Sequence, residues 1–313
     1  MVKAWKRRTM LGAGTTGMAT AGALLYRAAP GFWNQYAAER KRDIAPSPVV
    51  PDAKRWPDQG LHVAWLGHST ALIKIDGFTI ITDPVFSDRA GVNLGVTTLG
   101  VKRLVAPALE ISDLPEVDLI LLSHAHMDHF DLPSLRRLES KQVDVITAAQ
   151  TSDLLRVTKY KSVSELKWSE SKQVGPANIR GLEVNHWGAR VRTDTFRGFN
   201  GYLLQVGRYR VLFAGDTANT DKLRGVAGSA SVDLAIMPIG AYNPWIHYHC
   251  NPEQAWRMTQ EARAEHVLPV HHSTFQLSRE PVTEPLERLQ NAAGPAASKR
   301  IVVQGIGQEF HLA

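Results

Sequence analysis

The sequence predicts a mixed α/β protein in which two β-sheets are covered by helices on their outer faces. Short apolar or alternating runs that match strands outnumber the helical patterns. Hairpin signals alternate with strand–helix units, which is typical of layered sheets flanked by helices. Polar residues able to carry chemistry repeatedly follow the apolar runs directly, so we expect a site along one rim of the sheets.

The first half of the chain begins with a predicted hairpin. Asp76-Gly77 is a two-residue turn signal between two short runs with strand character. Later apolar runs predict buried strands, and two amphipathic pieces predict short helices. The expected strands are residues 61–66, 71–75, 78–82, 118–123 and 143–147, and the expected helices are 133–138 and 152–156.

The second half repeats the pattern. Asn251 followed by Pro252 predicts a helix that begins with an N-cap asparagine and a proline at its first position, and it continues to about residue 263. A second helix is expected over 282–290. The expected strands are residues 179–184, 201–206, 209–213, 232–237, 266–270 and, closing the chain, 301–304.

The positive charge is confined to the N-terminal segment. The chain of 313 residues carries a formal charge of +6, and residues 1–45 hold eight Lys or Arg against two Asp or Glu. The remainder holds 28 of each sign. The body therefore lacks the net excess of positive charge that would argue for nucleic acid, and we predict no nucleic-acid partner.

The N-terminal segment resembles an export signal or a membrane anchor. Basic residues at 3–8 precede an uncharged stretch from Thr9 to Tyr26, and Arg7-Arg8 forms a weak twin-arginine pattern. The stretch is rich in Gly, Ala and Thr, so its hydrophobic drive to span a membrane is small. We expect residues 1–45 to be a signal or anchor with a linker, and residues 46–313 to be one catalytic domain. The protein would then be membrane-associated or exported to the periplasmic side, or cytoplasmic if the segment is only a basic arm.

Cys250 is the single cysteine, so no intramolecular disulfide can form and cysteine usage does not reveal the compartment. Its position beside His249 raises the alternative of a thiolate ligand. A small, semi-apolar filler is the favoured interpretation.

The most informative stretch runs from Leu121 to Asp131 and reads LLSHAHMDHFD. An apolar run leads into it, so the polar cluster is expected at the end of a buried strand. Imidazole and carboxylate groups are ligands for zinc and similar first-row ions. Four such residues fall within six positions, enough to begin two neighbouring metal sites: His124, His126, Asp128 and His129.

The H-x-H-x-D-H pattern after an apolar strand resembles the signature of the metallo-β-lactamase fold hydrolases. The family's later ligands, a His, an Asp and a His, are matched in order by His186, Asp216 and His271. Further stretches resemble the branch of phospholipases D that hydrolyse N-acylphosphatidylethanolamine; they are residues 65–70, 82–90, 238–242 and 271–275. The resemblance implies an αββα sandwich over residues 46–313.

The resemblance also implies a role for each site residue. His124, His126 and His186 would hold one metal, Asp128, His129 and His271 a second, and Asp216 would bridge them. Two Zn²⁺ are expected, with Mn²⁺ or Fe as alternatives, together with a bridging hydroxide.

Three further residues have expected roles beside the metals. Asp83 would orient a metal-binding histidine, and His68 would support the site or line the pocket. His249, a catalytic candidate together with Asp128, would bind phosphate or protonate the leaving group. Ala125 and Met127 depart from the phospholipase pattern and bear on the shape of the pocket.

The leading functional hypothesis is hydrolysis of a phosphodiester, most of all an N-acylphosphatidylethanolamine. A basic loop at 187–198 and an aromatic segment at 242–248 would contact the anionic and apolar parts of such a lipid. The expected partners are this substrate, or another small phosphodiester, and a membrane surface, and the sequence leaves a homodimer open. The alternatives are a lactonase or sugar-phosphate hydrolase of the same fold, and a membrane-tethered metal-binding module without catalysis.

Overall fold

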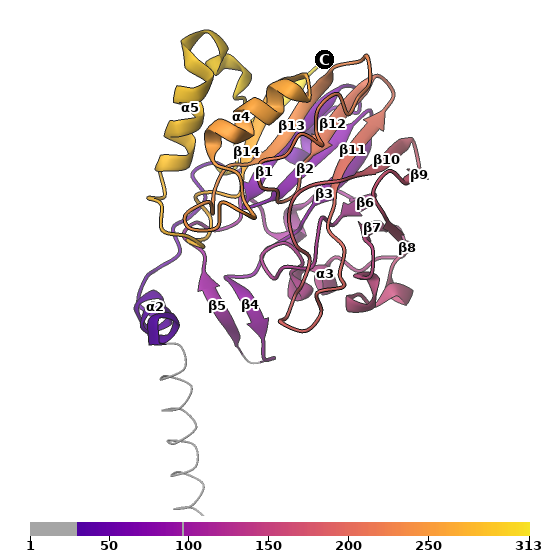
Figure 1. Ribbon diagram of the computed structural model, residues 1–313. Coiled ribbons are helices and arrows are strands. Elements are labelled where there is room, and N and C mark those ends of the chain that lie inside the picture. The colour runs from indigo at the N-terminus through magenta and orange to yellow at the C-terminus, as the bar shows by residue number, and fades with distance from the viewer. Residues whose placement is uncertain (1–29, 96) are drawn as a thin grey trace, which may run out of the picture. The chain divides into compact units, whose positions relative to one another are not determined.

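The computed structural model describes residues 30–95 and 97–313 (Figure 1). Two units are distinguished, with the division between Asp43 and Ile44. In the first unit the described part contains helix α2 (Pro30–Arg40), which the sequence patterns did not predict. The expected signal or anchor stretch lies outside the described residues and stays a prediction. Within the described residues, no helix is long and apolar enough to cross a membrane.

The second unit contains two large sheets. The seven-stranded sheet has the order β15-β1-β2-β3-β6-β7-β8, with parallel pairing from β3 through β8. Its strands are β1 (Leu61–Gly67), β2 (Thr70–Ile75), β3 (Phe78–Thr82), β6 (Leu119–Leu121), β7 (Asp144–Ala148), β8 (Ser162–Leu166) and β15 (Glu309–Leu312).

The second sheet has six strands in the order β14-β13-β12-β11-β10-β9, and β12, β13 and β14 run parallel. Its strands are β9 (Ser171–Val174), β10 (Ala177–Leu182), β11 (Gly201–Val206), β12 (Tyr209–Phe213), β13 (Val232–Pro238) and β14 (Ala264–Val270).

Side chains of the six-stranded sheet alternate between two apolar layers, because successive residues of a strand point to opposite faces. Leu234 and Ile236 of β13 pack into the large cluster shared with the seven-stranded sheet. Ala235 and Met237 pack on the other face, in the cluster that contains Trp256 and the helices. The arrangement is two sheets packed face to face with helices outside, which confirms the predicted αββα fold.

Two of the helices cover the outer face of the six-stranded sheet (Figure 1). Helix α4 (Pro252–Glu261) begins as predicted, since the Asn251 side chain accepts from the Gln254 backbone and the Gln254 side chain accepts from the Asn251 backbone. Helix α5 (Glu284–Ala297) packs beside it. Near the ligand motif, α3 (Leu132–Arg137) follows the predicted position, and Ser152–Leu154 is a short 3₁₀ turn.

The structure differs from the sequence prediction at the closing strand and at four strands that were not expected, of which β8 and β9 belong to the two large sheets. The expected closing strand at 301–304 is wrong, because Ile301 forms only an isolated bridge to Val267 and the closing strand is β15. A separate hairpin of β4 (Arg89–Asn93) and β5 (Thr98–Lys102) was not expected.

Candidate metal centre

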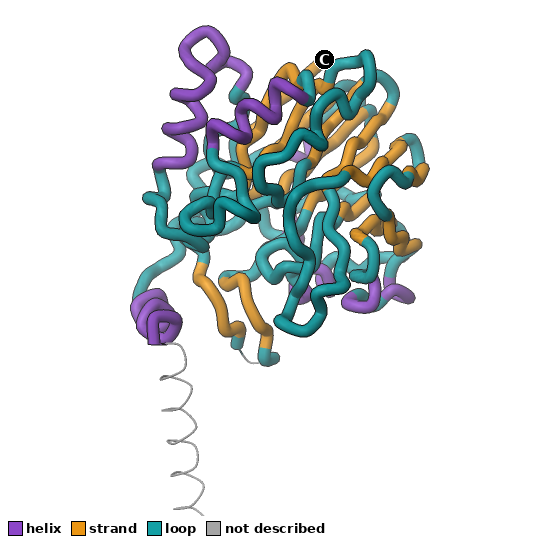
Figure 2. The backbone as a smooth tube through the Cα atoms, viewed as in Figure 1, coloured by secondary structure: helices purple, strands orange, loops and turns teal. Residues whose placement is uncertain are grey.

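The candidate site lies where strands of both sheets end. Figure 2 shows the segments after these strands as loops, and each carries a predicted site residue. Because neighbouring parallel strands present their carboxyl ends at one edge, the topology gathers these residues on one rim. Asp83 follows β3, His124 follows β6, His186 follows β10, Asp216 follows β12 and His271 follows β14.

Backbone geometry fixes the direction of several of these side chains. Gly215, with φ of 59°, precedes Asp216, and a Cβ at this position would lie 2.8 Å from the Asn200 carbonyl oxygen. A side chain is therefore excluded there, and glycine allows the strand end to turn Asp216 into the cluster. His271 itself has a left-handed φ of 62°.

The first group of imidazoles consists of the rings of His124, His126 and His186. The Nδ1 atom of His126 lies 2.8 Å from His124 Nε2 and 3.2 Å from His186 Nε2. Together with Asp216, these residues form a buried or half-buried set whose ligand atoms lie within 4.8 Å of one another. Three ring nitrogens and a carboxylate at this spacing suit one metal ion.

The second group lies on the opposite side of Asp216. The Nε2 atoms of His129 and His271 each lie 3.1 Å from Asp216 Oδ2. Asp128 Oδ2 lies 3.6 Å from His129 Nε2 and 3.5 Å from His271 Nε2. Asp216 Oδ2 is also 3.9 Å from both His124 Nε2 and His186 Nε2, so one carboxylate lies between the two groups.

Outer hydrogen bonds set the tautomers of two of the histidines. His129 Nδ1 donates to Asp83 Oδ2 at 2.7 Å, and His186 Nδ1 donates to the Tyr248 carbonyl oxygen at 2.8 Å. The Nε2 atom of each ring is then directed toward the cluster. Asp83 is held in turn by the Ser123 backbone N–H, which donates to its Oδ1 at 2.7 Å. Such outer partners orient metal-binding imidazoles.

Some imidazoles of the cluster are neutral because they are buried, whereas other groups of the cluster are charged because they lie beside groups of opposite charge. Burial lowers the pKa of the His124 and His186 imidazoles well below 6.5, so both rings are neutral. Burial alone would raise the pKa of the Asp216 carboxyl, but the adjacent His129 and His271 hold that pKa well below its usual range. Burial opposes protonation of His271 as well, yet Asp216 and Asp128 raise its pKa to about 9.

The donor set fits two first-row metal ions. Several buried polar atoms of the predicted ligands have no hydrogen-bond partner in the described residues; they are His126 Nε2, His129 Nε2, Asp216 Oδ1, His271 Nδ1 and His271 Nε2. Polar atoms left buried and unpaired cost free energy, which a metal ion would offset. The structure thus brings together all seven residues predicted as ligands, and their binding of metal stays a prediction.

His68 and His249 border the cluster. His68 Nε2 lies 3.0 Å from Asp128 Oδ2, which places it beside the second group, and its role as a support for a ligand stays a prediction. His249 Nδ1 is buried, has no hydrogen-bond partner and lies 3.7 Å from Asp216 Oδ2. Burial lowers the pKa of His249 to about 4, so its ring is neutral near pH 7.

A pocket of about 320 Å³ opens onto the cluster. Its walls combine apolar side chains with ligand residues and one arginine. Tyr248 and two tryptophans of the wall are partly exposed at the surface, with Trp187 at 45% and Trp245 at 50%. The lining residues are His126, Met127, Asp128, Trp187, Ala189, Arg190, Asp216, Ala241, Trp245, Tyr248, His249 and Leu277.

The basic loop at 187–198 contributes differently from the expectation that it cradles an anion as a whole. Arg190 lines the pocket, and its Nη1 donates to the carbonyl oxygens of Ala125 at 3.0 Å and Phe130 at 2.8 Å. Arg197 instead pairs with Asp153 and Asp194, both at 2.6 Å, and holds the loop in place. The sequence could not distinguish these roles, because the acidic partners of Arg197 are revealed only by the fold.

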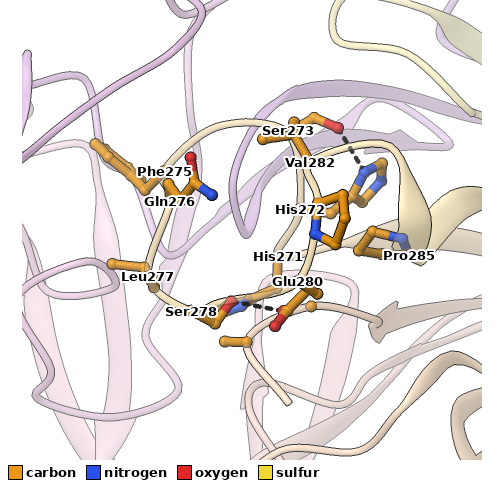
Figure 3. Close-up of a pocket in the computed structure, with 13 residues that line it drawn as sticks. His271, His272, Ser273, Phe275, Gln276, Leu277, Ser278, Glu280, Val282 and Pro285 are labelled. Carbon is orange, nitrogen blue, oxygen red and sulfur yellow. Dashed lines mark hydrogen bonds between the residues drawn. The ribbon is translucent and has the colours of Figure 1, made fainter. Parts of the chain in front are cut away.

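Behind His271 lies a second, much smaller cavity of about 20 Å³, which has room for one water molecule (Figure 3). The loop that follows His271 forms its wall, with His272 bonded to Ser273 at 2.9 Å and Ser278 bonded to Glu280 at 2.6 Å. These bonds stiffen the loop rather than create a second binding pocket.

Cys250 lies apart from the ligand groups found in the described residues. Its Sγ donates to the Pro238 carbonyl oxygen at 3.2 Å, and burial raises the pKa of the thiol to about 12. The side chain therefore packs as a neutral thiol, in agreement with the favoured interpretation of the sequence.

Comparison with known families gives a match over residues 79–272 to the β-lactamase superfamily domain. An uncharacterized protein of Mycobacterium tuberculosis is 34% identical over 263 residues, covering 81% of this chain and 70% of that protein. The N-acyl-phosphatidylethanolamine-hydrolyzing phospholipase D 1 of Caenorhabditis elegans is 30% identical over 251 residues, covering 74% of this chain and 70% of that protein.

Among solved structures, a metallo hydrolase from the hyperthermophilic archaeon Ignicoccus hospitalis superposes with a TM-score of 0.60. The match covers 82% of this chain and all of that protein, at 20% sequence identity. At this identity the likeness supports the fold and leaves the substrate open.

Proposed function

The chain belongs to the β-lactamase superfamily and is a metal-dependent hydrolase, and we propose that it hydrolyses N-acylphosphatidylethanolamine in a phospholipase D reaction with two zinc ions. The observation that carries the proposal is the pocket at the cluster, where one arginine faces aromatic and aliphatic side chains. A lipid of this kind has an anionic phosphodiester, which would pair with the arginine, and long acyl chains, which would pack against the apolar side chains. The curated phospholipase D relative from Caenorhabditis elegans supports the same substrate class.

Seven residues would hold the metals, in the two groups described above with Asp216 between them. His124, His126 and His186 would bind one ion, Asp128, His129 and His271 the other, and Asp216 both. When bound, the ions would stabilise charge on phosphoryl oxygens and make hydroxide available near neutral pH.

The remaining side chains position the substrate. Arg190 is anchored at Nη1 by two backbone carbonyls of the ligand loop, so its charge is fixed beside the cluster. In the described part of the chain no carboxylate forms an ion pair with it, which leaves the charge available for a phosphate oxygen. His249 lines the same pocket and would donate a hydrogen bond to an oxygen of the leaving alcohol. Trp187 and Trp245 would contact acyl chains and exclude water.

The product assay tests this proposal. Zinc-loaded protein is incubated with N-acylphosphatidylethanolamine in mixed micelles containing ¹⁸O-water, and the lipids are identified by mass spectrometry. Attack at phosphorus forms phosphatidic acid that carries the label and releases unlabelled N-acylethanolamine. Asp216→Ala protein serves as the blank. Rapid turnover of a small lactone or sugar phosphate, without any phospholipid product, would reject the proposal in favour of the alternative hydrolase class.

We further propose that residues 1–45 hold the protein at a membrane. The net charge of +6 in this segment attracts anionic lipids, and an uncharged stretch follows the first basic cluster. Removing residues 1–45 should shift the protein from the membrane fraction to the soluble fraction while hydrolysis of short-chain substrate persists. Full-length protein that already fractionates with the soluble proteins at low salt would contradict this.

A further inference from the structure

A second pair of close imidazoles lies outside the catalytic cluster. His62 of β1 and His311 of β15 are direct partners in the antiparallel pairing of these strands, and their Nδ1 atoms are 2.7 Å apart. In residues 30–95 and 97–313, ring nitrogens of two histidines otherwise meet only among His124, His126 and His186, at 2.8 and 3.2 Å. The pair thus reproduces, at the edge of the sheet, a contact typical of the metal cluster.

The hydrogen bonds of His62 identify its tautomer. The Gln59 carbonyl oxygen can only accept, so His62 Nε2, at 2.8 Å, carries the hydrogen. In the neutral ring, Nδ1 then carries a lone pair that is directed at His311 Nδ1. His186 in the catalytic cluster has the same arrangement, with one ring N–H bonded to a backbone carbonyl and the other nitrogen facing the site. This is the usual support for an imidazole that binds metal.

Trp56 covers the two imidazoles on one side and leaves the His311 side open to solvent. Its ring stacks on His62 with centroids 5.9 Å apart and meets His311 edge-on at 6.1 Å. The Trp56 Nε1 donates to Glu309 Oε1 at 2.6 Å, which fixes the indole in place. His62 is only 6% exposed, whereas His311 is exposed on the edge strand, so an ion can reach the pair from solvent on the His311 side.

The charges around the pair favour a cation. Lys74 of β2 is the cross-strand neighbour of His62, and its ammonium pairs with Asp58 at 2.6 Å. Glu309, two residues before His311 on the same strand, adds a second carboxylate. One cationic and two anionic side chains leave a net negative charge beside the two imidazoles.

We propose that His62 and His311 bind a divalent transition-metal ion through their Nδ1 atoms, with water molecules completing its coordination. Metal–nitrogen bonds of about 2.0–2.1 Å place two ligand nitrogens roughly 2.9 Å apart in the square-planar geometry that Cu²⁺ prefers, and roughly 3.4 Å apart at a tetrahedral angle. The exposed His311 ring therefore needs to move outward by less than about 1 Å. A site of two imidazoles without thiolate binds Cu²⁺ most strongly among the common divalent ions. The bound ion would fasten the edge strand β15 to β1.

The test uses the full-length protein with its catalytic ions loaded. Cu²⁺ is added under equilibrium dialysis, the bound copper and retained zinc are counted, and the electron paramagnetic resonance spectrum is recorded. The wild type should bind about one further ion per chain with two nitrogen ligands, without losing zinc, and its melting temperature should rise. His311→Ala should lose the further ion, the two-nitrogen signal and the rise in melting temperature. Its phosphodiesterase activity should be unchanged.

Two controls separate this site from general histidine binding. His247 is also exposed, and in the described residues its ring makes no hydrogen bond to another histidine, so His247→Ala should keep the further copper ion. Glu309→Gln keeps both imidazoles and should keep the ion at lower affinity, which shows that the edge strand is still folded. Equal copper binding by wild type and His311→Ala would overturn the proposal. Absence of any copper beyond exchanged zinc in the wild type would also overturn it, and the pair would then only share a proton.

Discussion

The metal cluster and the wall of its pocket differ in burial and in the elements that carry them. The ligands follow strands that are fixed by sheet pairing, and His124, His129, His186, Asp216 and His271 are all buried. The outer wall consists of loops, with two tryptophans and Tyr248 partly exposed. Under the proposed function, the sheets would fix the reaction chemistry, whereas the loops would select the substrate. Changes in the cluster should affect every substrate, and changes in the wall should affect some substrates only.

The largest effect is expected from Asp216→Ala. The Oδ2 of this residue lies between both groups of imidazoles, so both proposed metal ions would depend on it. Hydrolysis of phospholipid and of a short, soluble phosphodiester should fall together to the blank level. Activity that remains on only one of the two substrates would show that the cluster also contributes to substrate selection. Circular dichroism checks that the variant remains folded.

Asp83→Asn should have the next largest effect. The carboxylate accepts from His129 Nδ1 and thereby orients that ring. Loss of such an outer partner typically lowers metal affinity or activity by 10–100-fold, so a reduction of about this size is expected. Zinc affinity measured by competition with a chromophoric chelator is the readout. An unchanged affinity would mean that His129 is held by packing alone.

Arg190→Met probes the wall. A hydrogen bond to a charged group contributes roughly 1.5–3 kcal/mol, which predicts a loss of about 10–100-fold in kcat/KM for anionic phosphodiesters. Zinc content and turnover of a neutral lactone should be unaffected. Arg192→Met is the matched control, because Arg192 is an exposed residue of the same loop. Equal losses of kcat/KM in both variants would show that the effect comes from the overall positive charge of the loop and not from a contact between Arg190 and the phosphate.

Trp245→Ser should have a smaller effect that depends on the length of the acyl chains. Trp245 lines the pocket and is half exposed, so it would contact acyl chains rather than the phosphate. Turnover of long-chain substrate in micelles should fall several-fold, by loss of roughly 1 kcal/mol of apolar contact, with short-chain turnover unchanged. Trp168→Ser, at a comparably exposed tryptophan outside this pocket, is the control. A loss independent of chain length would reject the acyl-chain contact.

Cys250 should show the smallest effect, namely almost no reaction with a disulfide reagent at pH 8. Burial raises the pKa of its thiol to about 12, so thiolate is rare at pH 8 and the sulfur is enclosed. Unfolding in guanidinium should expose the group and give one reacting thiol per chain. Rapid reaction in the native protein would contradict the packed, neutral thiol.

The ligand motif was predictable because its residues lie close together in the sequence with a characteristic spacing. His124, His126, Asp128 and His129 follow one apolar strand, and the order of the later ligands matched a known pattern. The resemblance implied that Asp83 orients a metal-binding histidine, and the structure shows that His129 is the ring bonded to it. The tautomer of His186 was not predictable, because its partner is the backbone carbonyl of Tyr248, which lies far from it in sequence.

The strands that the sequence analysis missed lack the features on which it depended. β15 has only four residues, Glu309–Leu312, and lies at a sheet edge, so its alternation of polar and apolar side chains is too short to stand out in the sequence. β8 and β9 are also short, and most of their side chains are exposed or half-buried. In the unpredicted hairpin of β4 and β5, Gly91 and Gly100 face each other, and glycine weakens the propensity for strand. A Cβ on Gly91 would lie 2.1 Å from the Leu99 carbonyl oxygen, so this glycine serves close packing that only the fold reveals.

The central claim is that one rim of the sandwich holds two metal ions that share Asp216, and metal counting tests it most directly. Purified wild-type protein should contain about two ions per chain, mostly zinc. His126→Ala and His271→Ala should each retain about one ion, from the second and the first group respectively, and Asp216→Ala should retain neither. A wild type that holds no tightly bound metal and keeps its activity in strong chelator would contradict the account. Loss of a single ion in Asp216→Ala would show that the two groups do not share this carboxylate.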